Sequence, residues 1–450
     1  MQSDGSAPAL GDFVTLVRGT TYKSALLGQP GPVLLGLASI QRDGGFRADS
    51  LKTYGGESAE KLLLRPGDLY VSLKDVTQSG DLLGAVARVP DSVPLGRLTQ
   101  DTVKLQFDVS DYPADLLYWT LRAPEYRAYC RERAIGTTNL SLSRDDFLAF
   151  RLPPATVQRR LLVELLEAIE RRIDLLRQAN ATLEFIAQSV FKSWFIDFDP
   201  VRMKAEGREP EWMDAETAAL FPDSFEDSAL GAIPRGWHAS TLEGLTVTGK
   251  GLIQTGPFGS QLHASDYSIE GVPVVMPQDL EGRRISTARV ARVSSDHVKR
   301  LSRHKLRAGD IVFSRRGDVA RHATVSSAEA GWLCGTGCLL VRPGEEWPSR
   351  TYVSLALATT TASDWLYRHA VGATMPNLNT GILGALPVLL PAEPVLLVFE
   401  KVAGALEERI SKNLAQAETL ANIRDAVLPR LVSGKLRLPE TKAQLNEALA

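Results

Sequence analysis

The stretch QRRLLVELLEAIERRIDLLRQANATLEFIAQSVFKSW, residues 158–194, decides the fold of this 450-residue chain. Ten of its positions follow one another in alternating steps of four and three, and nine of the ten are apolar. They are Leu162, Leu166, Ile169, Ile173, Leu176, Asn180, Leu183, Ala187, Val190 and Trp194. No proline or glycine interrupts residues 155–199. A heptad pattern sustained over four repeats is typical of a coiled coil, so we expect one long helix over residues 155–198.

A second, weaker copy of this heptad pattern lies 237 residues further on, in residues 391–436. Eight of its ten positions are apolar, and the set is Phe399, Ala403, Leu406, Ile410, Asn413, Ala417, Leu420, Arg424, Val427 and Leu431. Each helix alone would expose an apolar seam, and an internal two-fold repeat would orient the two helices antiparallel. The sequence therefore predicts that the two helices pair with each other.

The antiparallel pairing has a predicted register. If Leu162 lies opposite Leu431, Asn180 falls opposite Asn413. A buried Asn pair costs stability but fixes the register, because a slip of one heptad would leave each amide against apolar groups. The same register places Trp194 opposite Phe399 and Arg424 opposite Ile169. Arg424 fits an apolar seam poorly, and we expect its charged end to reach outward to solvent.

The regions that precede the two helices resemble one another. LRPGDLYVS at residues 64–72 is repeated as LRAGDIVFS at residues 306–314, and GTTNL at 136–140 is echoed by GATMPNL at 372–378. Short apolar runs separated by glycine and proline predict short strands and turns in both regions. In the first region we also expect a helix over residues 116–133 and a last strand over residues 147–154.

The chain is thus predicted to be α+β. Two similar mixed α/β domains are separated by two long helices that form an antiparallel coiled coil, with internal pseudo-two-fold symmetry. The predicted parts are a first domain at 1–154, the central helix at 155–198, an acidic connector at 199–236, a second domain at 237–390, the C-terminal helix at 391–436 and a polar tail at 437–450.

Composition narrows the class of protein. The chain is 44% hydrophobic and 23% charged, which is ordinary for a globular protein, and it lacks a membrane-spanning run and a signal-peptide start. Three cysteines argue against a disulfide framework, so we expect a cytoplasmic protein without membrane association. The net charge is −2, but residues 281–322 hold 12 Lys/Arg against 4 Asp/Glu. Such a local basic concentration suits a phosphate backbone or a solvated charged face.

At this point the chain resembles a known family. Its layout, the segment around residues 158–207, the stretch IQTGPFGSQLHASDYSIEGVPVV at 253–275 and the stretch GATMPNLNTGILGALPVLLP at 372–391 look like the specificity subunit of a type I restriction–modification system. The resemblance implies that each domain is a target-recognition domain that reads one half of a bipartite, asymmetric site in double-stranded DNA. It also implies that the helices set the spacing and dock two methyltransferase (modification) subunits, which motor-nuclease (restriction) subunits join, and that this subunit itself catalyses nothing.

Specific DNA recognition needs side chains at base edges and phosphate contacts that position them. The candidates in the two domains are Arg42, Lys52, Lys74 and Gln78 in the first, and Arg283, Arg284, Arg315, Arg316, Arg321 and His322 in the second. Lys74 and Arg316 each lie ten residues after the leading leucine of the repeated segment, so they form the best-matched pair. The loops at 137–139 and 374–379 could contact DNA or simply close each domain.

Motifs for catalysis are incomplete. GLTVTGKG at 244–251 approaches a phosphate-binding loop, but Gly251 replaces the required Ser or Thr. Asp199-Pro200-Val201 lacks the second proline and the aromatic residue of an adenine methyltransferase motif, and Cys334 and Cys338 lack a second pair of zinc ligands. We therefore expect no catalytic residue, no metal and no cofactor. The alternatives are the specificity portion of a restriction–methylation enzyme with some catalytic activity, and a coiled-coil adaptor that binds only protein.

Overall fold

The structure, a computed structural model, describes residues 7–49, 51–107, 112–137, 139–287, 290–372 and 374–434. The predicted polar tail lies outside these residues, as does Thr138 of the first predicted loop. The chain divides into two compact units, residues 1–176 with 415–450 (unit 1) and residues 177–414 (unit 2). None of the helices in the described ranges combines the length and the apolar composition that a membrane span requires.

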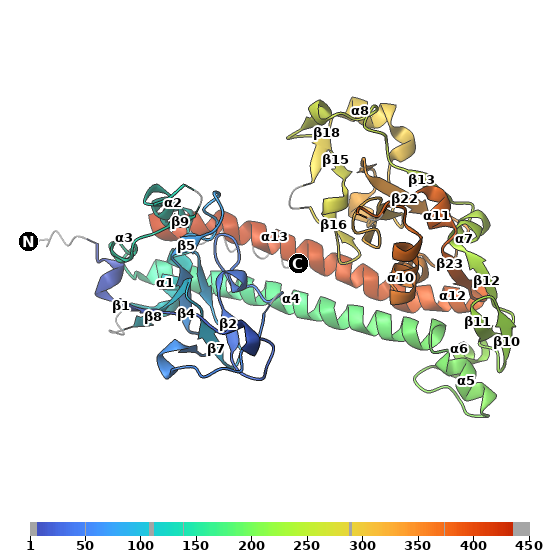
Figure 1. The fold of residues 1–450 in the computed structure, drawn as a ribbon, viewed down its shortest axis with the longest axis horizontal. Helices are drawn as coiled ribbons and strands as arrows, with labels where there is room; N and C mark the ends of the chain where they lie inside the picture. The colour runs from blue at the N-terminus through green and yellow to red at the C-terminus, as the bar shows by residue number, and fades with distance from the viewer. Residues whose placement is uncertain are drawn as a thin grey trace, which may run out of the picture. The chain divides into compact units, whose positions relative to one another are not determined.

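Two long helical segments confirm the heptad prediction (Figure 1). The first is α4, Val157–Phe195. The second consists of α12 (Glu393–Phe399), the π-helical turn η9 (Glu400–Gly404) and α13 (Ala405–Ser433). α4 lies within the expected residues 155–198, and α12 and α13 lie within the expected residues 391–436, of which 435 and 436 are outside the described residues. α4 stops where Phe198 adopts a left-handed backbone conformation (φ 56°), and α12 starts after Pro391.

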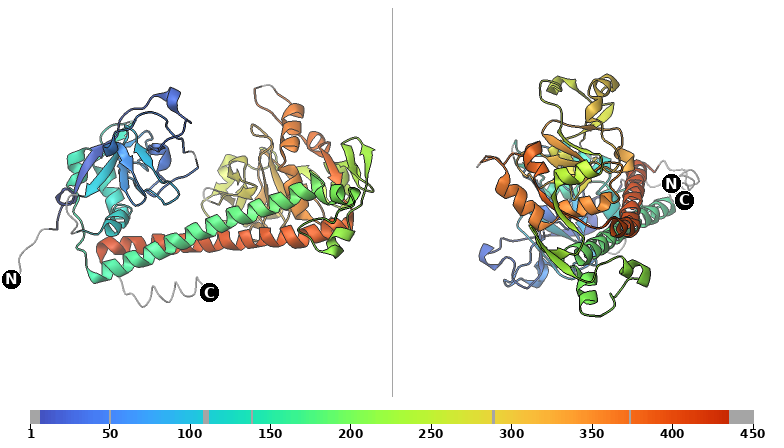
Figure 2. Two further views of the ribbon diagram at one scale, coloured as in Figure 1. Left: turned by 90° about the horizontal axis from the view of Figure 1, so that it is seen from below. Right: turned by 90° about the vertical axis from the view of Figure 1, so that its right-hand side faces the viewer.

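The predicted antiparallel register is confirmed within each unit, where the α4 segment lies alongside the C-terminal helix (Figure 2). In unit 1, Ile173 and Leu420 belong to one buried apolar cluster. In unit 2, Asn413 Nδ2 donates a hydrogen bond of 2.8 Å to Asn180 Oδ1. Further along unit 2, the rings of Trp194 and Phe399 lie 5.9 Å apart between centroids. The pairs that the sequence predicts are therefore partners in the structure.

The prediction for Arg424 is wrong. Its side chain is only 15% exposed, with the guanidinium 3.0 Å from Glu170 and 2.8 Å from Asp425. Burial acts to lower the pKa of Arg424, but the carboxylates of Asp425 and Glu170 outweigh burial and raise it. An ion-pair partner on the facing helix therefore holds this charge at the seam, which removes the need to reach bulk water.

Unit 1 is built on an antiparallel four-stranded sheet with the order β1-β8-β4-β6, which are Val14–Arg18, Thr102–Phe107, Leu69–Ser72 and Val86–Arg88. A second sheet has the order β2-β7-β3, which are Val33–Leu35, Gly96–Leu98 and Leu63–Leu64. The remaining elements are β5 (Lys74–Asp75), α1 (Ala114–Thr120), α2 (Pro124–Glu132), β9 (Leu140–Ser141) and α3 (Arg144–Leu148).

Two local predictions for unit 1 need correction. The helix expected over residues 116–133 is two helices, because Pro124 starts a new helix at its first position. In the strand expected over residues 147–154, the first two residues end α3, and only Arg151 forms an antiparallel bridge, with Ala9. Ser143 caps that helix, since its hydroxyl accepts a hydrogen bond of 3.0 Å from the Asp146 amide.

Unit 2 repeats the main sheet of unit 1. Its antiparallel sheet has the order β13-β22-β19-β20, which are Leu252–Thr255, Cys338–Arg342, Ile311–Ser314 and His322–Thr324. The repeated sequences LRPGDLYVS and LRAGDIVFS thus provide the third strand of equivalent sheets, β4 and β19. The internal repeat predicted from the sequence is a repeat of fold.

Further strands and helices complete unit 2. A second sheet has the order β14-β18-β15-β21, which are Tyr267–Ser268, Ala291–Val293, Val272–Val275 and Leu333–Cys334. The strand pairs are β12 (His238–Thr241) with β23 (Pro387–Leu390), and β16 (Leu280–Glu281) with β17 (Arg284–Ile285). The helices are α7 (Leu242–Thr248), α8 (Ser295–Arg300), α9 (Arg350–Leu357), α10 (Thr360–His369) and α11 (Thr380–Gly384).

The acidic connector packs on the aromatic core of unit 2. It forms α5 (Asp199–Ala205), α6 (Ala215–Ala219) and the hairpin β10–β11 (Phe225–Ser228 and Gly231–Pro234). Phe221 and Trp237 are almost fully buried, and the Phe195 ring lies 5.8 Å from that of Trp237 and 4.9 Å from that of Phe399. Large aromatic side chains therefore attach the connector to the helix ends by burying apolar area.

Candidate nucleic-acid interface

Two of the predicted DNA contacts, Arg283 and Arg284, lie against the helices instead of facing solvent. The Arg283 guanidinium is 2.8 Å from Glu184 of α4 and 2.7 Å from Glu407 of α13, and Arg284 lies 2.5 Å from the other oxygen of Glu407. Burial acts to lower the pKa of Arg283, and the two glutamates outweigh it and raise that pKa. Both arginines are neutralised in place, so we do not retain them as DNA contacts.

His322 is also buried. Its side chain stacks on Phe313 with ring centroids 4.9 Å apart, and its Nδ1 lies 2.9 Å from the Ala320 carbonyl oxygen. Burial lowers the pKa of His322 below its ordinary value, which favours the neutral imidazole. A neutral, buried ring is suited to packing in the core of the sheet and not to binding a polyanion such as DNA.

The turn between β19 and β20 holds the remaining candidates of unit 2. Arg316 is exposed, and in the described part of the chain no carboxylate lies within ion-pair distance of it. Arg315 is half-buried and donates to the Leu378 carbonyl at 3.3 Å, while Arg321 is 43% exposed and lies 3.3 Å from Asp318. An open depression of about 600 Å³ adjoins this turn; Arg283, Asp318, Arg321 and His322 are among its lining residues, and Arg316 lies outside it. Arg316 is the cation most available to a ligand here.

The four candidates of unit 1 are all exposed. Arg42 lies 3.7 Å from Asp81, and Lys74 lies 3.3 Å from Asp101 with half of its side chain exposed. Lys52 and Gln78 are exposed in loops. Exposed ion pairs of this kind contribute about 0–1 kcal/mol and exchange easily for a phosphate or base partner.

Asp75, which the sequence reasoning missed, organises the loop that carries Gln78. It is fully buried and accepts hydrogen bonds from the Thr77 amide at 2.8 Å, the Thr77 hydroxyl at 2.8 Å and the Leu82 amide at 2.7 Å. A buried carboxylate satisfied by backbone donors is a strong local constraint. The D-x-T pattern after a strand could have signalled it, since Asp commonly forms such turns.

Lys74 and Arg316 occupy equivalent backbone positions. The Ser72 hydroxyl donates to the Lys74 carbonyl at 2.5 Å, and the Ser314 hydroxyl donates to the Arg316 carbonyl at 2.8 Å. Lys74 pairs with Ser141 in the β5–β9 ladder, and Arg316 pairs with Asn377 in an isolated antiparallel bridge. The repeat therefore places one exposed cation at the same point of each domain.

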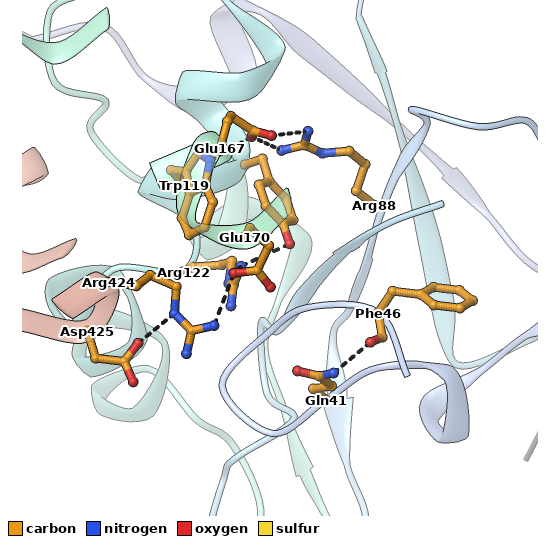
Figure 3. A network of polar contacts seen from close by, with 10 residues as sticks. Gln41, Phe46, Arg88, Trp119, Arg122, Glu167, Glu170, Arg424 and Asp425 are labelled. Atoms are coloured by element: carbon orange, nitrogen blue, oxygen red, sulfur yellow. Dashed lines mark hydrogen bonds and ion pairs between the residues drawn. The ribbon is translucent and has the colours of Figure 1, made fainter. Parts of the chain in front are cut away.

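A polar network that the sequence reasoning missed attaches the first domain to the helices in unit 1 (Figure 3). Glu167 of α4 lies 2.6 Å from Arg88 of β6 and accepts a hydrogen bond of 2.7 Å from Trp119 Nε1. Glu170, one helical turn further on, lies 3.8 Å from Arg122 and 3.0 Å from Arg424. The glutamates beside the apolar seam thus hold the domain in place through charge-assisted hydrogen bonds.

The described residues form neither a metal-binding site nor a reactive thiol site. No group of three or more His, Cys, Asp or Glu side chains there is arranged to hold a metal ion. Cys130, Cys334 and Cys338 are free and buried. Burial raises the pKa of Cys130, and a hydrogen bond with Cys334 together with burial raises that of Cys338, so the Cys130 and Cys338 thiols favour the unreactive protonated form.

Comparison with known proteins gives a consistent result, although no family model matches the chain. The specificity subunit of type I restriction enzyme HindI from Haemophilus influenzae is 26% identical over 361 residues, which cover 71% of this chain and 76% of the relative. The specificity subunit of type I restriction enzyme MjaIX from Methanocaldococcus jannaschii is 24% identical over 340 residues, which cover 74% of this chain and 70% of the relative.

A solved structure has a similar fold. The S subunit of a type I restriction–modification system from M. genitalium superposes with a TM-score of 0.56 at 14% identity, and the match covers 96% of this chain and 98% of that one. Two sequence relatives and this structure carry the same description. The chain is thus similar over most of its length to the specificity subunits of two type I restriction enzymes, and its fold resembles that of a solved S subunit.

Proposed function

We propose that this chain is the sequence-specific DNA-recognition subunit of a type I restriction–modification complex in the cytoplasm. Its recognition domains, residues 1–154 and 237–390, each read one half of a bipartite, asymmetric site. The observation that carries the proposal is the repeated sheet order with unlike side chains at equivalent turns, such as Lys74 in unit 1 and Arg316 in unit 2. Two similar frames with different reading residues suit two different half-sites.

The subunit works without catalysing a reaction. Its homologues are specificity subunits, which are non-catalytic parts of their complexes. The chemistry then belongs to two methyltransferase subunits and to the motor-nuclease subunits that join them. Large apolar side chains on α4 point away from the paired seam and support docking of a protein partner. They are Val157 at 69%, Leu161 at 42%, Leu175 at 57%, Phe185 at 70% and Ile186 at 41% exposure.

The helices act as a spacer between the two readers in this proposal. α4 runs unbroken for 39 residues and contributes to both units, so its length is a property that both recognition domains share. The hydrogen bond between Asn180 and Asn413 fixes one register of the pair. A fixed register gives a fixed number of residues between the readers, and hence a fixed number of base pairs between half-sites.

A domain exchange in the complete complex tests the proposal. Residues 1–154 are replaced by the first recognition domain of a homologous specificity subunit, and the modified genomic positions are mapped by sequencing in cells that contain the methyltransferase subunits. We expect one half of the methylated motif to change while the other half and the spacing stay the same. An unchanged motif would show that these residues do not read DNA.

A further inference from the structure

A row of three residues recurs at the same place in both recognition domains. In unit 1, Ile135 and Ser141 exchange two backbone hydrogen bonds of 2.8 and 2.9 Å, and Ser141 pairs on its other side with Lys74. In unit 2, Val371 and Asn377 exchange hydrogen bonds of 3.0 and 2.9 Å, and Asn377 pairs on its other side with Arg316. We call these the first row (Ile135–Ser141–Lys74) and the second row (Val371–Asn377–Arg316).

The backbone of the two rows is matched in detail. Gly136 and Gly372 follow the apolar residue of each row and both have a positive φ, 110° and 106°. A Cβ added to Gly136 would lie 2.3 Å from the Asn139 carbonyl oxygen, so a side chain there would force the turn open. The residue after the middle member of each row is also hydrogen bonded alike, because the Leu142 and Leu378 amides each donate at 2.9 Å to the carbonyl of the residue before the cation, Leu73 or Arg315.

Each row presents its side chains on one face. Residues directly opposite each other in an antiparallel ladder project to the same side of the sheet. Ile135 is 60% exposed and Val371 is 64% exposed, and the cation at the other end of each row, Lys74 or Arg316, is exposed as well. Neither core uses these apolar side chains, yet both domains place a β-branched residue at this point.

We propose that the two rows read base edges in the two halves of the bound DNA site. This inference rests on the proposed function and names the residues that provide specificity. The cation of each row suits the O6 and N7 acceptors of guanine, and the β-branched side chain suits the methyl group of thymine. Neighbouring strands lie about 4.8 Å apart, so the ends of a row are separated by about 10 Å, roughly three base-pair steps of 3.4 Å.

The two rows differ in how sharply they discriminate. Arg316 has a planar guanidinium that can donate two hydrogen bonds to one guanine, and no described carboxylate competes for it. Lys74 is a point charge that first has to leave Asp101, 3.3 Å away. The second half-site therefore has the more strictly specified guanine.

The test uses the full chain together with the methyltransferase subunits, and the methylated motif is mapped by sequencing. One variant combines Arg316→Gln with Val371→Ala, and a second combines Lys74→Gln with Ile135→Ala. The matched control is Lys299→Gln, because Lys299 is a 79% exposed cation on α8 of unit 2 that belongs to neither row. We expect the first variant to relax bases in the second half-site only and the second variant to relax bases in the first half-site only.

For the Arg316→Gln and Val371→Ala variant, we expect the preference for the native base over its competitor to fall roughly 5- to 150-fold at the affected positions. The control should keep the full motif. If both double variants lower the amount of methylation but leave every base of the motif unchanged, the rows hold phosphates and the inference is wrong. If the wild-type motif is independent of this chain, the proposed function itself fails.

Discussion

Asn413 donates a hydrogen bond of 2.8 Å to Asn180 across the paired helices, at the point where both heptad patterns have an asparagine. Both residues lie in unit 2, and Asn413 is 4% exposed. A buried amide pair satisfied by itself tolerates only one alignment of the helices, because any slip leaves two amides without partners.

We therefore predict that a single substitution in this pair lowers stability and that a second substitution restores it. Asn413→Leu alone leaves the Asn180 amide against an apolar side chain and should lower stability by about 1–3 kcal/mol. Asn180→Leu together with Asn413→Leu should recover that loss while allowing other registers. Thermal unfolding of the four members of the cycle measures the coupling, with Glu418→Ala on the exposed face of α13 as the control. Additive effects of the two substitutions would contradict a paired amide.

The helices and their register were predictable because they rest on a local period. Steps of four and three fix which side chains meet, and the two polar positions fix the alignment without any long-range information. The matched positions of Lys74 and Arg316 were predictable for a similar reason, since a repeated sequence implies a repeated backbone. Whether either one contacts DNA stays a prediction.

The partners of the charged side chains were not predictable in this way. Arg283 lies in the most basic stretch of the chain, but Glu184 and Glu407 are 99 and 124 residues away in sequence. Local charge density says nothing about carboxylates that the fold brings in from other elements. The strand expected over residues 147–154 is shortened at its start for a local reason, because the cap formed by Ser143 and Asp146 begins a helix that runs to Leu148.

A second prediction concerns Arg283 as an anchor of unit 2. Arg283→Met removes the ion pair with Glu184 and one of the two arginines beside Glu407, which should destabilise the protein by about 1–3 kcal/mol. The melting temperature of the full chain measures this effect. Lys299→Gln, an exposed pair in the same unit, should change stability by less than about 1 kcal/mol. If Arg283→Met changes the methylated motif at a temperature where the variant is still folded, Arg283 would instead have a role in reading DNA.

The same ion pairs predict a pH dependence. Burial acts to raise the pKa of Glu407, but Arg283 and Arg284 outweigh burial and lower it below its ordinary value of 4.5. A carboxyl group with a lowered pKa in the folded state stabilises the fold above its unfolded pKa, and this stabilisation is lost as the pH falls through the folded value. Unfolding titrations from pH 6 downward should show stability falling below about pH 4.5, with a shallower slope in Glu407→Gln. An equal slope in both proteins would place the titrating group elsewhere.

His322 gives a second titration with its own pH window. Burial lowers its pKa from the ordinary value of 6.5, so the unfolded state binds a proton more readily than the folded state does. This group therefore adds stability above about pH 6.5 that is lost as the pH falls through its lower folded-state pKa. His322→Phe, which keeps the stacking on Phe313, should flatten the stability profile just below pH 6.5 and leave the methylated motif unchanged. A relaxed motif in this variant would restore His322 as a DNA contact.

The spacer role of the helices predicts the effect of a matched insertion. Seven residues that continue the heptad pattern are inserted after Arg177 in α4 and before Gln416 in α13, which are equivalent points in the register set by Asn180 and Asn413. One heptad adds about 10 Å to each helix, or roughly three base pairs of 3.4 Å. In the complete complex the methylated motif should keep both half-sites and gain about three base pairs between them. Insertion into α4 alone breaks the alignment of the Asn pair and should abolish methylation. A matched insertion that leaves the spacing unchanged would show that the helices do not set it.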